Sequence, residues 1–297
     1  MSDRPRPIDF VPTARGTFAT LARGPLEGPV VLCLHGFPDA AGTFDALLDA
    51  LADAGFRAVA PWMRGYAPSV IAGPYDPDAL ALDVIALADA LSPNAPVAVV
   101  GHDWGAVATY AALSLRPPRF ARAVTLAVPH PAAFAESLVR SASQRRRSWY
   151  MGAFQLPFAG AIVARNLRPL VERLWRDWSP GFTAPRAHLD DVVRAIEGGM
   201  PAPIAYYRAM VRPLVPALAR LRRAASSERK IRVPTLLLVG ENDGCIAPSS
   251  GDGQARFFAG DFRAEVLPSV GHFLHLEAPA EVAQRVVAFL APGAGSR

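Results

Sequence analysis

VAVVGHDWGA, residues 97–106, is the stretch of sequence that decides the fold. Its four leading apolar residues predict a strand buried on both faces, as in a parallel sheet. A helical pattern follows over Trp104–Leu115. The small residues Gly101 and Gly105 allow a tight turn between strand and helix, which pushes Asp103 out at the carboxyl end of the strand. A side chain presented in this way is a candidate nucleophile.

Strands and helices alternate on both sides of this turn, and the same rhythm returns near the end of the chain. Such alternation predicts a mostly parallel, doubly wound α/β sheet. The predicted strands cover residues 17–23, 29–35, 57–60, 97–102, 123–128, 233–240 and 263–267, and the predicted helices cover residues 44–54, 78–91, 104–115 and 281–290.

The middle of the chain breaks this rhythm. From residue 132 to residue 230 no strand is evident, and the segment is helical in pattern, rich in Arg and Trp, and interrupted by prolines. We therefore expect residues 132–230 to form a helical cap (lid) domain. It would be inserted into an α/β core domain made of residues 1–131 and 231–297.

Two further residues complete a catalytic triad with Asp103. Asp243 comes just after a predicted strand, in Gly-Glu-Asn-Asp-Gly, and His272 follows the last predicted strand. The order nucleophile, acid, histidine is the one expected when the nucleophile sits on such a strand-to-helix turn. Each residue also lies where open α/β sheets place their sites. Aspartate is common at helix N-caps and turns as well, and Glu241 is the alternative acid, but three residues in this order favour the triad.

The loop after the strand at residues 29–35 carries His-Gly-Phe-Pro. In this architecture that loop supplies one oxyanion-hole N–H, and the residue after the nucleophile supplies another. We expect these donors to be the backbone amides of Phe37 and Trp104.

An aspartate nucleophile changes the chemistry. Its pKa near 4 leaves it charged at neutral pH, so Asp103 can attack an sp³ carbon directly and form an alkyl-enzyme ester. His272 then deprotonates a water that hydrolyses the ester, while Asp243 orients the imidazole and stabilises its charged form. This order of events disfavours an esterase or lipase.

The motifs HGFPD (35–39), RGYAPS (64–69), GHDWGA (101–106), GENDG (240–244) and GHFLHLEAP (271–279) together resemble those of the epoxide hydrolases. The resemblance extends over about residues 8 to 290 and implies the α/β-hydrolase fold. Its motifs are specific to the aspartate-nucleophile branch, which also contains haloalkane and fluoroacetate dehalogenases. The chain departs from the family at Trp62, where an aspartate is usual, and at Ala67, where a glycine is usual. We expect both changes to affect packing rather than chemistry.

In epoxide hydrolases of this kind two lid tyrosines hold and protonate the epoxide oxygen. One belongs to a Tyr-x-x-x-Phe-Gln pattern, which Tyr150 begins here, and the other to an aromatic-Tyr-Arg pattern, which assigns the role to Tyr207. The resemblance thus implies opening of an epoxide to a vicinal diol. The side chains expected to contact the substrate are Phe37, Trp104, Trp149 and Phe154.

Two other functions stay open. A haloalkane or haloacid dehalogenase would use the same triad, and Trp104 is suited to halide binding; against it, Phe37 stands where many haloalkane dehalogenases have asparagine. Trp149-Tyr150 also stands where fluoroacetate dehalogenases have His-Trp. A binding protein without turnover is the second alternative, since fold does not fix function, but such a protein needs no complete triad.

The composition of the chain indicates which classes of partner and cofactor it is expected to bind. The formal charge is +5, yet the arginines are scattered and no nucleic-acid-binding signature accompanies them, which favours a solvated basic surface. Cys33 and Cys245 have no disulfide or metal spacing, and there is no dinucleotide fingerprint, so we expect no metal and no cofactor. The N-terminus lacks an apolar signal region and no apolar run reaches about 18 residues. We expect a cytoplasmic monomer or homodimer that acts on a hydrophobic epoxide and water, without nucleic-acid or membrane partners.

Overall fold

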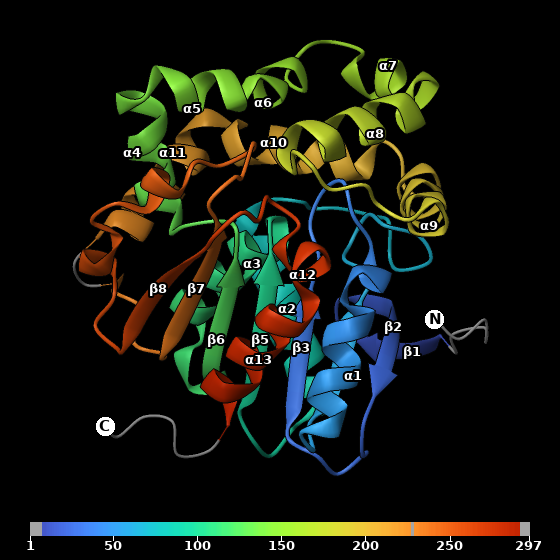
Figure 1. The fold of residues 1–297 in the computed structure, drawn as a ribbon, viewed down its shortest axis with the longest axis vertical. Coiled ribbons are helices and arrows are strands. Elements are labelled where there is room, and N and C mark those ends of the chain that lie inside the picture. Colours follow the sequence, from blue (N-terminus) through green and yellow to red (C-terminus); the bar gives the residue numbers. More distant parts are fainter. Residues whose placement is uncertain (1–7, 227–228, 292–297) are drawn as a thin grey trace.

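The computed structural model describes residues 8–226 and 229–291, so most of the N-terminal segment searched for a signal lies outside the described residues. The described part contains one eight-stranded sheet at its centre (Figure 1). Its strand order is β1-β2-β4-β3-β5-β6-β7-β8; β2 pairs antiparallel with β1 and β4, and all other pairs are parallel. The strands are β1 (Asp9–Thr13), β2 (Gly16–Arg23), β3 (Val30–Leu34), β4 (Arg57–Pro61), β5 (Val97–His102), β6 (Phe120–Leu126), β7 (Thr235–Gly240) and β8 (Phe262–Leu267).

All seven predicted strands are present, and β1 is an addition to them. β1 pairs only with β2, at the edge of the sheet. Its side chains are mostly exposed, so its sequence, DFVPT, lacks the apolar run that marks the inner strands. Pro12, which cannot donate a ladder hydrogen bond, is tolerated in such an edge strand.

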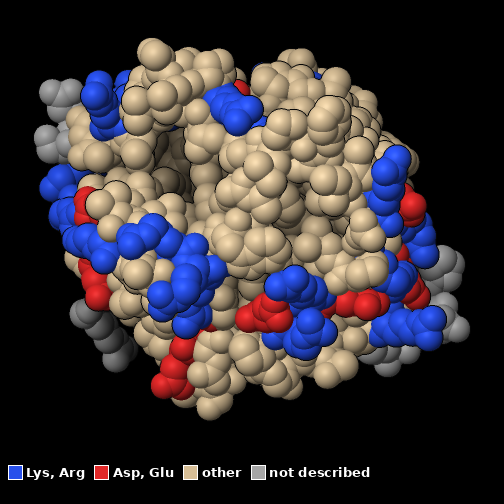
Figure 2. Space-filling model, turned by 90° about the horizontal axis from the view of Figure 1, so that it is seen from above, with Lys and Arg blue, Asp and Glu red and all other residues tan. Residues whose placement is uncertain are grey.

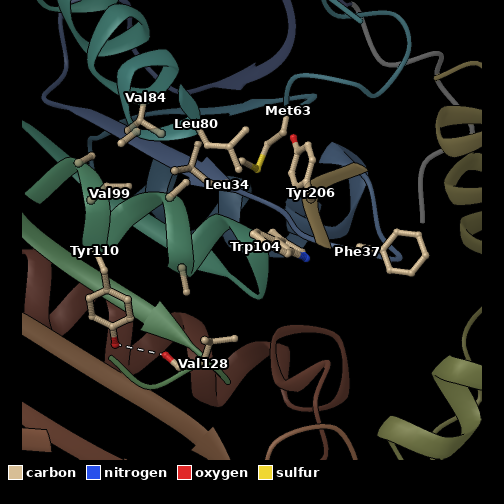
Figure 3. Close-up of a cluster of buried hydrophobic side chains, with 14 of the residues drawn as sticks. Leu34, Phe37, Met63, Leu80, Val84, Val99, Trp104, Tyr110, Val128 and Tyr206 are labelled. Carbon is tan, nitrogen blue, oxygen red and sulfur yellow. Dashed lines mark hydrogen bonds between the residues drawn. The ribbon is translucent and has the colours of Figure 1, made fainter. Parts of the chain in front are cut away.

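Helices cover both faces of the sheet (Figure 1). On one face lie α1 (Asp45–Asp53), α12 (Leu274–Glu277) and α13 (Pro279–Leu290), and on the other lie α2 (Pro77–Leu91) and α3 (Trp104–Leu115). The second face forms the larger apolar core, which reaches from α2 and α3 to the carboxyl ends of the strands. Figure 3 labels part of this core, including Leu34, Met63, Leu80, Val84, Val99, Tyr110 and Val128.

Eight helices from the middle of the chain lie together above the carboxyl ends of the parallel strands (Figure 1), and we call them the helical layer. No strand occurs in the described part of this segment, as predicted, although its assignment as a cap domain over residues 132–230 stays a prediction. No described helix is long and apolar enough to cross a bilayer. The helices are α4 (Pro131–Arg140), α5 (Ala142–Arg147), α6 (Trp149–Ala153), α7 (Ala159–Arg165), α8 (Leu167–Trp178), α9 (Arg186–Glu197), α10 (Ala202–Val211) and α11 (Leu214–Ala225).

The RGYAPS segment has a structural role, as expected. Arg64 and Asp83 form a buried ion pair with two hydrogen bonds of 2.6 and 2.7 Å, and Arg15 donates to the same carboxylate at 2.6 Å. Trp62 packs partly buried against the core, and the Ala67 N–H donates to a carbonyl of α9. The segment therefore joins the sheet to the helical layer, and the Tyr66 hydroxyl donates to the Gly36 carbonyl at 3.4 Å.

Candidate active site

The turn between β5 and α3 holds Asp103 in an unusual backbone conformation, with φ 49° and ψ −117°. A positive φ is uncommon for a residue with a side chain and marks a position fixed by its surroundings. A Cβ on Gly101 would lie 2.4 Å from the Gly105 carbonyl oxygen, and one on Gly105 would lie 2.0 Å from that of Leu34. Both positions therefore require glycine, and the close packing lifts Asp103 out of the strand.

One carboxylate oxygen of Asp103 sits in the predicted oxyanion hole. The Phe37 N–H donates to Asp103 Oδ1 at 2.8 Å. A Cβ built on Gly36 would lie 2.3 Å from this oxygen and 2.6 Å from the Trp104 nitrogen, so the Trp104 backbone also passes close to this loop. Gly36 has no side chain because the backbone must approach the carboxylate this closely.

The predicted acid and base are in contact. His272 Nδ1 and Asp243 Oδ2 are 2.8 Å apart and both residues are buried. Asp243 Oδ1 accepts from the N–H groups of Cys245 and Ile246 at 2.7 and 2.8 Å, which fixes its orientation. The other ring nitrogen, Nε2, points to the predicted nucleophile, at 3.7 Å from Asp103 Oδ2. The structure thus brings all three predicted residues together, whereas Glu241 is exposed and accepts a hydrogen bond from the Ser269 amide.

Two opposing effects set the pKa of His272. Burial acts to lower it, but the carboxylates of Asp243 and Asp103 outweigh burial and raise the pKa of His272 to about 10. At neutral pH the imidazole is therefore protonated.

Residues that the sequence patterns do not mark also support the site. The Trp178 carbonyl, at the end of α8, accepts from the backbone N–H groups of both His272 and Gly244. His102 Nε2 lies 3.0 Å from the His272 carbonyl oxygen, beside the turn. A backbone carbonyl leaves no signal in the sequence, so the contribution of Trp178 emerges only from the structure.

The two predicted tyrosines pack edge-on against each other and line the same cavity as Asp103. Their ring centroids are 5.6 Å apart, and both side chains are buried. The Tyr150 hydroxyl lies 3.3 Å from Cys245 Sγ, and the Tyr207 hydroxyl has no hydrogen-bond partner among the described residues. Burial, together with the nearby Asp103 charge, raises the pKa of each tyrosine well above its usual value. Both hydroxyls therefore keep their protons. Tyr206 does not share this position, because its hydroxyl donates to the Arg64 carbonyl.

A cavity of about 340 Å³ opens beside these groups, within the size range of small-molecule sites. Seen from above (Figure 2), the helical layer is hollowed on the side where α4 and α11 lie in Figure 1. Four of the residues proposed for the site line the cavity, and the rest of its wall is mostly apolar. The four are Asp103, Trp104, Tyr150 and Tyr207.

Three of the predicted substrate contacts lie elsewhere. Phe37 and Phe154 are buried and pack edge-on against Tyr207, and neither is part of the described cavity wall. Trp149 is 43% exposed and its ring lies under the guanidinium of Arg173. The prediction for Trp149 is therefore not supported by its position, since its helix turns the ring outward while the adjacent Tyr150 faces inward.

Among the residues that the structure describes, two groups of buried side chains are close enough to share a metal ion. One contains the triad pair itself. In the other, His275 Nε2 lies 2.6 Å from Thr43 Oγ1, and His188 lies 3.3 Å from Asp39. Each group has partners within the protein, and the absence of a metal stays a prediction. The groups are Asp243, Cys245 and His272, and Asp39, His102 and His275.

Comparison with known proteins decides the family. The model of the family described as "Alpha/beta hydrolase family" matches residues 31–285. The chain belongs to the alpha/beta hydrolase family. Among curated proteins this hydrolase is 30% identical to an epoxide hydrolase of Caballeronia sordidicola, over 89% of this chain and 88% of that protein. It is 29% identical to epoxide hydrolase 3 of Xenopus tropicalis, over 92% of this chain and 74% of that protein.

Solved structures agree with this assignment. A putative epoxide hydrolase from Klebsiella pneumoniae superposes with a TM-score of 0.82 at 25% identity, covering 95% of this hydrolase and 96% of that chain. The predicted fold, the predicted family and the prediction that the chain is an enzyme of the epoxide hydrolase group are confirmed.

Proposed function

We propose that this enzyme opens epoxides to vicinal diols through a covalent ester on Asp103. The observation that carries the proposal is the pairing of a buried carboxylate with two buried, protonated tyrosines beside one cavity. An epoxide needs a nucleophile at carbon and a proton donor at oxygen, because an alkoxide is a poor leaving group. The names of the relatives support the same reaction.

In the first step Asp103 attacks an epoxide carbon and the ring C–O bond breaks. The developing alkoxide takes a proton from Tyr150 or Tyr207. Because the carboxylate is already ionised, this attack needs no base. The product is a hydroxyalkyl ester of Asp103 and a tyrosinate.

Ester formation prepares the second step. It removes one of the two negative charges that hold the proton on His272, so the pKa of His272 falls and its proton can return to the tyrosinate. The neutral imidazole then takes a proton from water as the hydroxide adds to the Asp103 carbonyl carbon. The amides of Phe37 and Trp104 would stabilise the oxyanion, and collapse expels the diol, which takes its last proton from the new Asp103 carboxyl group.

In this proposal residues 132–230 act as a cap that carries the tyrosines over the core. A halide leaves without a proton, so a dehalogenase would have no need of a proton donor at that place, whereas the alkoxide of an opened epoxide takes a proton from a buried hydroxyl group. The reaction requires no metal or organic cofactor.

The test is a panel of substrates given to the purified enzyme. Styrene oxide and aliphatic epoxides should yield diols, while chloroalkanes, fluoroacetate and p-nitrophenyl esters should give little product. Release of halide without diol formation would replace the proposal by the dehalogenase alternative.

A further inference from the structure

The cavity extends away from Asp103 in one direction. It follows one face of α3, where Trp104, Val107, Ala111 and Leu115 line it at spacings of three and four residues. These positions span the whole helix, and a rise of 1.5 Å per residue gives a length of about 16 Å. The space is therefore elongated, with the nucleophile at one end.

The opposite wall comes from the helical layer and is apolar. Phe134 and Leu138 of α4, Met210 of α10, and Leu214 and Leu218 of α11 face the cavity. None of the described residues of α11 is buried, so this helix covers the space without packing into a core.

Ion pairs hold α11 in place against α2. Arg223 contacts Asp78 at 2.5 Å and Arg220 contacts Asp76 at 3.8 Å, so α11 is tied to the start of α2. The arginines and Asp78 belong to the cavity wall, which makes this part of the wall polar.

On the other side of Asp103 the space is filled. Phe37 packs edge-on against Phe154, with centroids 5.7 Å apart. Trp178 lies 4.9 Å from the Tyr150 ring and 5.1 Å from the His272 ring. All three aromatic side chains are at most 3% exposed, and none of them is among the described residues that line the cavity.

From this asymmetry we infer the substrate class: epoxides that carry one long apolar substituent on a single ring carbon. The inference rests on the proposed function. With the ring between Asp103 and the tyrosines, the substituent on one carbon runs along α3 under α11. The second carbon faces packed aromatic rings, so it has room for hydrogen atoms but not for a chain.

Two isomers with the same number of carbons test this directly. 1,2-Epoxydodecane places its whole chain on one carbon, whereas cis-6,7-epoxydodecane divides it between two. We expect kcat/KM for diol formation to be about 100-fold higher for the terminal isomer, because a second chain must displace close-packed side chains. Equal kcat/KM values for the two isomers would overturn the substrate assignment. 1,2-Epoxypropane serves as a short substrate. If the enzyme turned over none of the three epoxides, the proposed function itself would be refuted.

Two variants test whether the preference for the terminal isomer comes from the open side or from the filled side of Asp103. Ala111→Phe should obstruct the space along α3, which lowers kcat/KM for 1,2-epoxydodecane at least 10-fold and spares 1,2-epoxypropane. Phe154→Ala should make room on the filled side and raise turnover of the internal isomer. The inference would be contradicted if Ala111→Phe, with an unchanged melting temperature, lost as much kcat/KM on 1,2-epoxypropane as on 1,2-epoxydodecane. It would also be contradicted if a folded Phe154→Ala variant turned over the internal isomer no faster than the wild type.

Discussion

His272 Nε2 lies 3.7 Å from Asp103 Oδ2, beyond hydrogen-bonding distance, and has no hydrogen-bond partner among the described residues. A serine nucleophile would need this imidazole to remove its proton before it attacks. In the proposed mechanism the carboxylate needs no such help, so the two residues act one after the other. The proposal therefore predicts that mutation can stop the enzyme between its two half-reactions.

His272→Ala should react once and stop. Attack by Asp103 survives the loss of the histidine, but hydrolysis lacks its base, so the ester should accumulate. Intact-protein mass spectrometry should show an adduct with the mass of the epoxide, and peptide mapping should place it on Asp103.

Asp103→Ala is the matched control and should show no adduct. In addition, wild-type enzyme in heavy-oxygen water under single turnover should carry the label on Asp103, because the new oxygen of the diol comes from the carboxylate. Label in the diol after the first turnover would mean that water attacks the epoxide, and Asp103 would then be at most a base.

The tyrosine hydroxyls should control ring opening. Tyr150→Phe or Tyr207→Phe should slow ester formation by about 100-fold or more, as expected for the loss of a general acid, and the double variant should nearly abolish it. Rapid-quench measurement of the adduct checks this, with circular dichroism to confirm the fold. Tyr206→Phe is the neighbouring control, since its hydroxyl donates to the Arg64 carbonyl. Normal epoxide turnover by the double variant would exclude the role of both tyrosines.

The pKa of His272 should respond to the charge on Asp103. In the wild type its value of about 10 exceeds the value of about 6.5 in an unfolded chain. Its contribution to stability is therefore complete below about pH 6.5 and is lost as the pH rises to about 10. Asp103→Asn removes one carboxylate, so the pKa should fall and this contribution should shrink. NMR titration of the imidazole nitrogens measures the change, and identical titration curves would contradict the proposed second step.

Loss of Asp83 should destabilise the fold. Its carboxylate is buried and binds both Arg64 and Arg15. Asp83→Ala leaves a buried guanidinium without its partner and should cost about 3–5 kcal/mol of unfolding free energy. Asp191→Ala, which breaks an exposed pair with Arg194, should cost less than about 1 kcal/mol. Similar urea midpoints for the two variants would refute this difference.

Activity should survive metal removal. The proposed steps use only side chains, backbone amides and water. Dialysis against EDTA should leave kcat for epoxide hydrolysis unchanged, and activity that is lost to the chelator and restored by a divalent ion would show that one of the two metal-compatible groups is occupied in the active protein.

The sequence predicted those parts of the fold and of the site that depend on a short run of neighbouring residues. The apolar run of β5 and the glycines around Asp103 fix the turn within ten residues of sequence, and Asp243 and His272 each follow a strand end. β1 escaped prediction because an edge strand exposes most of its side chains and carries no long apolar run.

Contacts between distant segments explain what the sequence could not give. Trp149 and Tyr150 are neighbours in the chain, yet one faces solvent and the other the cavity. The packing of α6 on the rest of the molecule determines which of the two side chains faces the cavity. The one-sided shape of the cavity likewise results from helices that are far apart in the chain, so no local pattern indicates it.

The placement of the site on two separate parts of the chain has an evolutionary consequence. The residues proposed as nucleophile, acid and base come from loops at strand ends, whereas much of the cavity wall comes from α4, α10 and α11. Mutations in those helices can reshape the range of accepted molecules while the reacting atoms keep their geometry. Selection for new substrates can therefore proceed in small steps that each leave a working enzyme.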